Sequence, residues 1–153
     1  MSAQFAPPQS SLDKLDAALK RLAERNGFVR LADEAALDAA LDADGLAVLL
    51  LTDDPQRSPE SLDVVVVLPE ALRALGVTAS GLAAGADLSP ALARRFGVNR
   101  YPAVVVLRGG AYLGVISGIL DWSPFVTELA RISALAPSRP PISIATQATR
   151  SCA

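Results

Sequence analysis

The residues that could do chemistry gather in one short stretch between two apolar segments. It contains four acids around a single arginine, and one serine hydroxyl: Asp53, Asp54, Glu60 and Asp63, Arg57, and Ser61. Carboxylates in this arrangement are typical of a solvated loop whose acids cap a helix, and equally of an acidic rim that binds a basic peptide. Both interpretations stay open at the level of sequence.

The missing residue types restrict the chemistry further. The chain has no histidine and one cysteine, Cys152, which is next to last. Without an imidazole, Ser61 would need a lysine or carboxylate base to act as a nucleophile, and a structural role at the start of a helix is the simpler interpretation. One cysteine cannot make an internal disulfide or a Cys-x-x-Cys site, and the usual zinc ligands are absent. We therefore expect no enzyme activity and no cofactor or metal. An enzyme using Ser61 or Cys152 is an alternative.

The amino-acid composition limits which class of protein this chain can belong to. With 153 residues, 51% of them hydrophobic, and a net charge of −2, the chain fits one domain with a substantial core. The sequence has no basic stripe, and this argues against a nucleic-acid partner. The first residues lack the basic and apolar segments of a secretory signal, and no apolar run reaches the roughly 20 residues that span a bilayer. We expect a cytoplasmic protein without stable membrane insertion.

Turn residues and apolar periodicity divide the chain into a flexible N-terminus (1–11), one domain (12–135) and a disordered tail (136–153). Within the domain, Leu46 to Leu51 predicts a strand buried on both faces. Asp63 is expected to cap a helix that runs from Val64 and is kinked at Pro69. The other expected elements are helices at 12–25, 33–44, 89–96 and after Asp121 or Ser123, and strands at 28–31 and 80–88. Their inward residues include Leu12, Leu15, Leu19, Leu22, Leu37, Leu41, Phe125, Leu129 and Ile132.

The last third of the domain has the most specific pattern. A short helix ends at Gly97, and Tyr101-Pro102 directly precedes the apolar strand 103–107. Gly109-Gly110 then predicts a hairpin turn into the strand 111–117. Helix, proline, strand, hairpin, strand and helix in this order resemble the second half of a thioredoxin fold. We therefore expect an α/β, thioredoxin-like fold: a central mixed sheet of about four to five strands flanked by helices, with a cis-proline loop at Tyr101-Pro102.

The thioredoxin resemblance also locates the position where redox chemistry would occur. Counting back from Pro69, the two active-site cysteines of a redox thioredoxin correspond to Ser61 and Val64. A valine cannot become the thiolate that exchanges disulfides. The expectation is a frame without redox activity, in which the backbone of Tyr101 stays free to pair with an extended peptide.

Three further segments narrow the resemblance to one family. They are residues 54–60 (DPQRSPE), 95–103 (RFGVNRYPA), and the run 108–115 (RGGAYLGV) followed by Gly118-Ile119 and Trp122. Together they resemble the HyaE/HupG/HoxO accessory proteins of uptake hydrogenase operons, over roughly residues 12 to 135. The resemblance implies a non-catalytic chaperone that binds the twin-arginine signal peptide of the small-subunit precursor of a nickel–iron hydrogenase before export. Other hydrogenase accessory proteins are possible further partners.

A partner-binding site follows from the residues rather than from the family. We predict a groove formed by the loop after the apolar strand, the start of the next helix and the proline loop. Its members are Asp53, Asp54, Arg57, Glu60, Ser61, Val64, Tyr101 and Pro102. Acids there would orient the arginines of a signal peptide, while apolar contacts supply most of the affinity. The alternative is a general thioredoxin-like interaction module with no link to hydrogenase.

Overall fold

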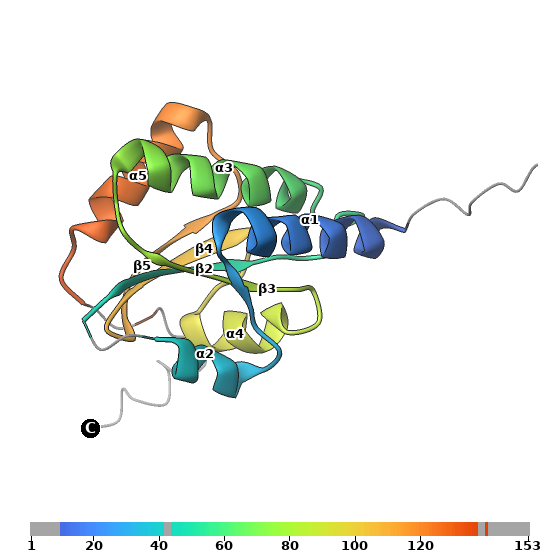
Figure 1. The fold of residues 1–153 in the computed structure, drawn as a ribbon, viewed down its shortest axis with the longest axis horizontal. Helices are drawn as coiled ribbons and strands as arrows, with labels where there is room; N and C mark the ends of the chain where they lie inside the picture. Colours follow the sequence, from blue (N-terminus) through green and yellow to red (C-terminus); the bar gives the residue numbers. More distant parts are fainter. Residues whose placement is uncertain (1–9, 42–43, 138–139, 141–153) are drawn as a thin grey trace, which may run out of the picture.

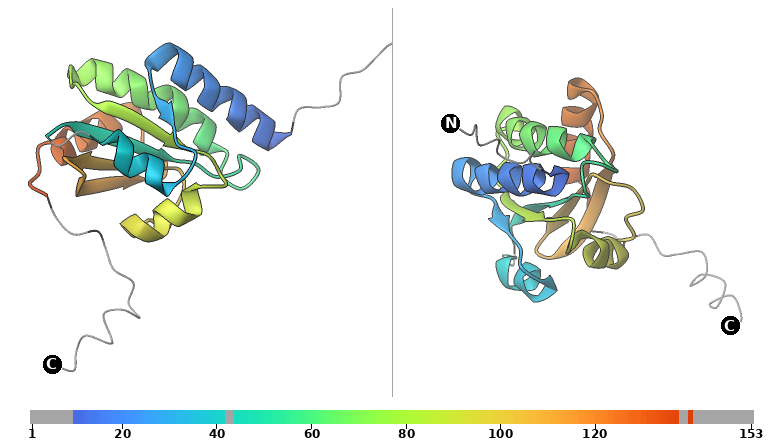
Figure 2. Two further views of the ribbon diagram at one scale, coloured as in Figure 1. Left: turned by 60° about the horizontal axis from the view of Figure 1, so that its bottom comes forward. Right: turned by 90° about the vertical axis from the view of Figure 1, so that its right-hand side faces the viewer.

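A five-stranded mixed sheet with helices on both faces forms the structure, a computed structural model that describes residues 10–41, 44–137 and 140. The strand order is β1-β3-β2-β4-β5, and helices α1, α3 and α5 cover one face while α2 and α4 cover the other (Figure 1). Figure 2 shows the same two layers from the side. In chain order the elements are α1 (Ser11–Asn26), β1 (Val29–Arg30), α2 (Glu34–Ala40), β2 (Leu46–Leu51), α3 (Glu60–Leu75), β3 (Ser80–Ala84), α4 (Ser89–Phe96), β4 (Ala103–Arg108), β5 (Ala111–Ser117) and α5 (Trp122–Ser133).

The central strand β2 pairs in parallel with β3 and antiparallel with β4. All six of its residues are buried, which confirms the predicted strand with two covered faces. Its side chains alternate between two cores, because successive residues of a strand point to opposite faces. Val48 and Leu50 belong to the core under α1, α3 and α5, whereas Leu49 and Leu51 belong to the core over α2 and α4.

The hairpin after α4 is the part that the sequence predicted best. The Tyr101-Pro102 peptide bond is cis, as expected. Strands β4 and β5 pair antiparallel around Gly109 and Gly110, whose φ angles of 59° and 80° require glycine. The expected fold class, a mixed sheet flanked by helices with a cis-proline loop, is confirmed.

The prediction for α3 was wrong at its start. The helix begins at Glu60, four residues before the expected Val64, and its N-cap is Pro59. Asp63 is therefore an exposed residue of the first turn and not the cap. Four consecutive valines remain helical because Val64 and Val65 are buried against the sheet, and tertiary packing outweighs their intrinsic preference. Pro69 lies inside the helix, as predicted.

Several other predicted boundaries differ from those in the structure. Helix α1 starts at Ser11, with Ser10 Oγ accepting a hydrogen bond from the Asp13 N–H at 3.1 Å, so residue 11 belongs to the domain and not to the flexible N-terminus. Leu12, which was predicted to point inward, is 46% exposed, whereas Ala18, which was not among the predicted inward residues, is buried. The α2 helix ends at Ala40, before the predicted residue 44, and β3 ends at Ala84, before the predicted residue 88. The flexibility predicted for 1–9 and for most of 136–153 falls on residues outside the described part. No helix in the described ranges has both the length and the apolar character needed to cross a bilayer.

Candidate functional site

The loop that joins β2 to α3, residues 52–59, is organised around the Asp53 carboxylate. The Arg57 guanidinium donates to both of its oxygens, Nη2 to Oδ1 at 2.7 Å and Nε to Oδ2 at 3.2 Å. The Asp54 N–H donates to Oδ1 at 2.8 Å, and the Ser58 hydroxyl donates to Oδ2. The hydrogen bonds from Arg57 lower the pKa of Asp53 below its usual value. The loop is thus a compact turn built around an ionised carboxylate whose charge is largely matched by Arg57.

Asp54 carries the less compensated charge of this loop. Its Oδ1 accepts hydrogen bonds from the Ser11 hydroxyl at the start of α1 and from the Gln56 N–H at 3.0 Å. These bonds, first the one from Ser11, lower the pKa of Asp54 and keep it ionised at neutral pH. Among the described residues, Oδ2 makes no hydrogen bond. It is therefore an acceptor still available to an incoming cation. Glu60, partly exposed in the first turn of α3, adds a second carboxylate without an ion-pair partner within the described ranges.

Ser61 and Val64, the positions that correspond to the missing cysteines, lie below this surface. Their exposed fractions are 0% and 1%, so neither of these two predicted groove residues presents its side chain at the surface. The Ser61 hydroxyl accepts a hydrogen bond from the Asp53 N–H at 3.2 Å. Ser61 thus ties the loop to the start of α3, and its hydrogen-bond partner there is a backbone donor and not a base. Val64 fills the core beneath the helix.

The cis-proline loop borders the acidic loop, because Ala103, next to Pro102, pairs with Leu51 at the end of β2. Burial raises the pKa of the Tyr101 phenol, and the negative charge of Asp53 raises it further. The Pro102 side chain is buried, and its carbonyl accepts the Gly118 N–H at 2.7 Å. In the described part of the chain, the N–H and carbonyl of Tyr101 make no backbone hydrogen bond. Pairing with an extended peptide requires such unpaired backbone groups, and the role predicted for them stays a prediction.

Three apolar side chains complete the surface, and sequence analysis did not assign them to the site. Ile119 and Leu120 follow Gly118 in the turn from β5 to α5, and Trp122 is the first residue of α5; they are 39%, 37% and 48% exposed. The hydrogen bond from Gly118 to Pro102 places this turn against the cis-proline loop. We call these three residues the apolar turn. The signal that could have found it was visible: three large apolar residues within four positions, following neither helical nor strand periodicity.

The β2–α3 loop, the cis-proline loop and the apolar turn lie at the same end of the sheet, because Leu51 pairs with Ala103 and Ala103 pairs with Ser117. Acids, unpaired backbone groups and exposed apolar side chains thus occur in three neighbouring segments. Two pockets, of about 600 and 690 Å³, lie elsewhere, beside α1 and α3 and at the ends of β1 and β3. Across the described residues, no group of three potential metal-binding side chains occurs.

Comparison with known proteins shows the family of this chain. Residues 18–125 match the family described as hydrogenase-1 expression protein HyaE. The chain belongs to the HyaE family. A hydrogenase expression/formation protein HoxO from Cupriavidus necator is 39% identical over 145 residues, which cover 92% of this chain and 88% of HoxO. HupG from Bradyrhizobium diazoefficiens is 41% identical over 96 residues, covering 63% of this chain and 65% of HupG.

Comparison with a solved structure supports the fold. A mutant thioredoxin from Halobacterium salinarum superposes with a TM-score of 0.56 at 17% identity, covering 71% of this chain and 93% of the thioredoxin. The thioredoxin-like fold is thereby shown. Both expectations from the sequence, the family and the fold, are confirmed. The relatives of this HyaE-family chain are hydrogenase expression/formation proteins.

Proposed function

We propose that this HyaE-family protein is a non-catalytic chaperone in hydrogenase maturation that binds the twin-arginine signal peptide of the small-subunit precursor before export. The observation that carries the proposal is the meeting of the acidic β2–α3 loop and the apolar turn on either side of a cis-proline loop. A twin-arginine signal has a basic end followed by an apolar segment. The two halves of the surface match the two halves of such a peptide.

The apolar half supplies most of the binding free energy. Burying one large apolar side chain contributes about 1.5–3 kcal/mol, whereas an exposed ion pair contributes about 0.2–1 kcal/mol. Ordering the peptide costs about 2–5 kcal/mol. Trp122 and Leu120 therefore hold the apolar segment, while Asp54 and Glu60 set the orientation of the arginines. The free backbone groups of Tyr101 add main-chain hydrogen bonds that do not depend on sequence.

Two residues in the same place support the proposal of a non-catalytic role. At the position of the first thioredoxin cysteine, the Ser61 hydroxyl is buried and bonded to a backbone N–H. At the second, Val64 belongs to the core. The frame of an oxidoreductase is thus kept as a docking surface. The proposed place of action is the cytoplasm, where a precursor awaits export, and other hydrogenase accessory proteins are further partners.

Titration of a labelled signal peptide tests the proposal. The probe is a synthetic twin-arginine signal of a hydrogenase small subunit, compared with the same peptide carrying glutamine at both arginines. Trp122→Ala should weaken binding by roughly 10- to 150-fold, the equivalent of one lost apolar contact. Asp54→Ala combined with Glu60→Ala should weaken it by about 2- to 30-fold and should remove the preference for arginine over glutamine.

Matched controls of the same residue classes lie away from the proposed surface. Leu135, which is 40% exposed, lies beyond the far end of α5, and Glu24 lies near the far end of α1. Leu135→Ala and Glu24→Ala should leave the affinity within twofold. Equal effects of Trp122→Ala and Leu135→Ala would place the binding site elsewhere. A pull-down from hydrogenase-expressing cells that recovers no hydrogenase subunit would instead favour a general interaction module.

A further inference from the structure

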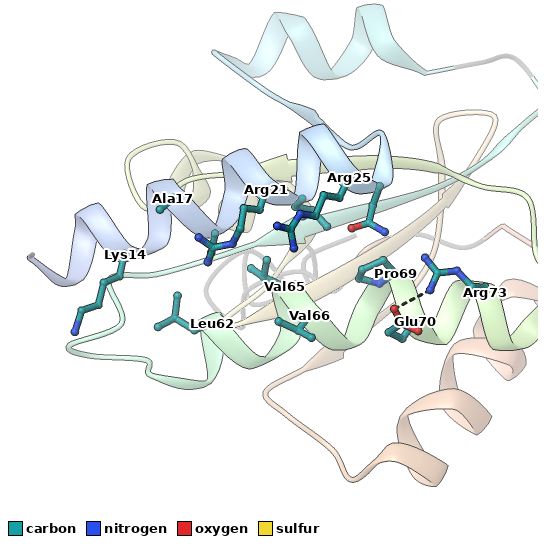
Figure 3. A pocket seen from close by; sticks show the side chains of 13 residues that line it. Lys14, Ala17, Arg21, Arg25, Leu62, Val65, Val66, Pro69, Glu70 and Arg73 are labelled. Atoms are coloured by element: carbon teal, nitrogen blue, oxygen red, sulfur yellow. Dashed lines mark hydrogen bonds and ion pairs between the residues drawn. The ribbon is translucent and has the colours of Figure 1, made fainter.

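A second surface, on the outer side of α1 and α3, has the opposite charge. It is a groove of about 600 Å³ between the two helices (Figure 3). Lys14 and Leu62 lie at one end, and Arg25 and Arg73 lie at the other. The floor includes Val65, which is buried, so the groove sits directly over the core.

Each helix contributes one wall, and the two walls differ in chemistry. On α1, Lys14, Arg21 and Arg25 have the spacing i, i+7 and i+11, which places them on one side of the helix. On α3, Leu62, Val66 and Pro69 have the spacing i, i+4 and i+7, which also places them on one side of the helix. Val66 is 66% exposed, the largest exposed fraction of the large hydrophobic residues within the described ranges. One wall is cationic and the other apolar.

The charge of the cationic wall is not matched by the chain itself. Glu70, the one acid that lines the groove, pairs with Arg73 at 2.7 Å. Lys14, Arg21 and Arg25 have no ion-pair partner within 4.0 Å among the described residues. By contrast, Lys20 and Arg30, which lie outside the groove, both have one. Among the described cations of α1, those without an ion-pair partner are the three that line the groove.

The length of the wall limits what can occupy it. Lys14 and Arg25 are eleven residues apart on one helix, a rise of about 16 Å at 1.5 Å per residue. A single small anion cannot contact both ends. A helix of about eleven residues can, if its apolar side chains and its acids lie on adjacent sides. A basic peptide is repelled by this wall, so the groove does not serve the same ligand as the acidic loop.

We propose that the α1–α3 groove is a docking site for an acidic amphipathic helix of a partner protein. The helix lays its apolar residues against Leu62, Val66 and Pro69, and its carboxylates face Lys14, Arg21 and Arg25. This is the helix-in-groove mode of recognition. The site is independent of the signal-peptide site, so the two can be occupied by different proteins.

Fluorescence anisotropy with three designed helical peptides tests this inference on the full chain. All carry leucines at i, i+4, i+7 and i+11, and the flanking positions carry glutamate, glutamine or lysine. The glutamate peptide should bind at least fivefold more tightly than the glutamine peptide, and the lysine peptide most weakly. The preference for glutamate should shrink between 50 and 500 mM salt, because the charges are exposed.

Single substitutions at exposed positions separate the groove from its surroundings. Arg21→Gln should weaken the glutamate peptide by about 1.5- to 5-fold. Lys20→Gln, at the neighbouring position outside the groove, should leave it unchanged. Val66→Ser should weaken it by about tenfold. The inference is overturned if glutamate and glutamine peptides bind alike, or if Arg21→Gln and Lys20→Gln have the same effect. Two other outcomes overturn it in favour of a different occupant: dimers that Val66→Ser dissolves in sedimentation equilibrium, or binding to phosphatidylglycerol vesicles without binding to any peptide.

Discussion

Two buried hydroxyl groups fix the start of the acidic β2–α3 loop, and removing each of them should lower the free energy of unfolding by a different amount. Thr52 and Ser89 are both 0% exposed. Thr52 Oγ1 donates to the Ala84 carbonyl at 2.7 Å, and Ser89 Oγ donates to the same carbonyl at 3.3 Å. Ser89 Oγ also accepts the Thr52 N–H at 3.0 Å. The end of β2, the end of β3 and the start of α4 are thereby joined where the loop leaves the sheet.

The order of the two effects follows from which polar group is left without a partner. Ser89→Ala leaves the buried Thr52 N–H without its acceptor, which costs about 1–3 kcal/mol. Thr52→Val keeps the shape of the side chain and leaves the Ala84 carbonyl with the Ser89 donor, so the cost is the net value of one hydrogen bond, about 0.5–1.5 kcal/mol. Ser89→Ala should therefore lower the free energy of unfolding more than Thr52→Val does.

Urea denaturation followed by circular dichroism measures both values, and thermal melts should show shifts of about 2–8 °C per kcal/mol. Ser133→Ala is the matched control, since the Ser133 hydroxyl donates to the Leu129 carbonyl near the end of α5 and is only partly buried. We expect it to change the free energy of unfolding by less than about 0.5 kcal/mol. A Thr52→Val variant less stable than Ser89→Ala would refute the reasoning, and so would three variants of equal stability.

Three further predictions concern packing, pH and redox activity. Gly81→Ala should lower the free energy of unfolding by about 1–3 kcal/mol, because a Cβ there would lie 2.5 Å from the Phe28 ring; a thermal melt unchanged from wild type would contradict this. The folded-state pKa of Asp53 is lowered by Arg57, so this pair contributes stability above the ordinary carboxylate pKa of 3.8, and the contribution is lost as pH falls through the lowered value. The stability difference between wild type and Arg57→Gln in urea melts should accordingly be constant above about pH 5 and shrink below pH 4; a difference that grows toward low pH would be inconsistent with it. In an insulin-reduction assay the wild type should show no activity above a Cys152→Ser control, and turnover above that control would revive an enzymatic function.

Local patterns in the sequence were enough for most of the fold. The run Leu46 to Leu51 could only be a strand covered on both faces, and Gly109-Gly110 could only be a tight turn. Tyr101-Pro102 before an apolar strand indicated the cis-proline loop. Each inference rests on a preference of the backbone or on a short period, and neither needs contacts from distant parts of the chain.

The errors fall where distant contacts compete with local preference. Asp63 was expected to cap α3, but the helix begins at Glu60, and the valines that follow are helical because Val64 and Val65 are buried against the sheet. Leu12 matched the apolar period of α1, but it lies at the end of the helix, beyond the edge of the core. Ser61 was predicted to be a member of the partner groove, and the structure places its hydroxyl beneath the loop, bonded to the Asp53 N–H.

The sequence by itself determined the family, the fold class and the lack of a Cys-x-x-Cys site, since each depends on which residue types are present and in what order. Only the tertiary structure decided which side chains reach the surface together. It joined the apolar turn to the cis-proline loop through the Gly118–Pro102 hydrogen bond, and it placed the cations of α1 opposite the apolar wall of α3. The physical reason is that exposure and proximity depend on how elements far apart in the chain pack against each other, and a local pattern does not contain that information.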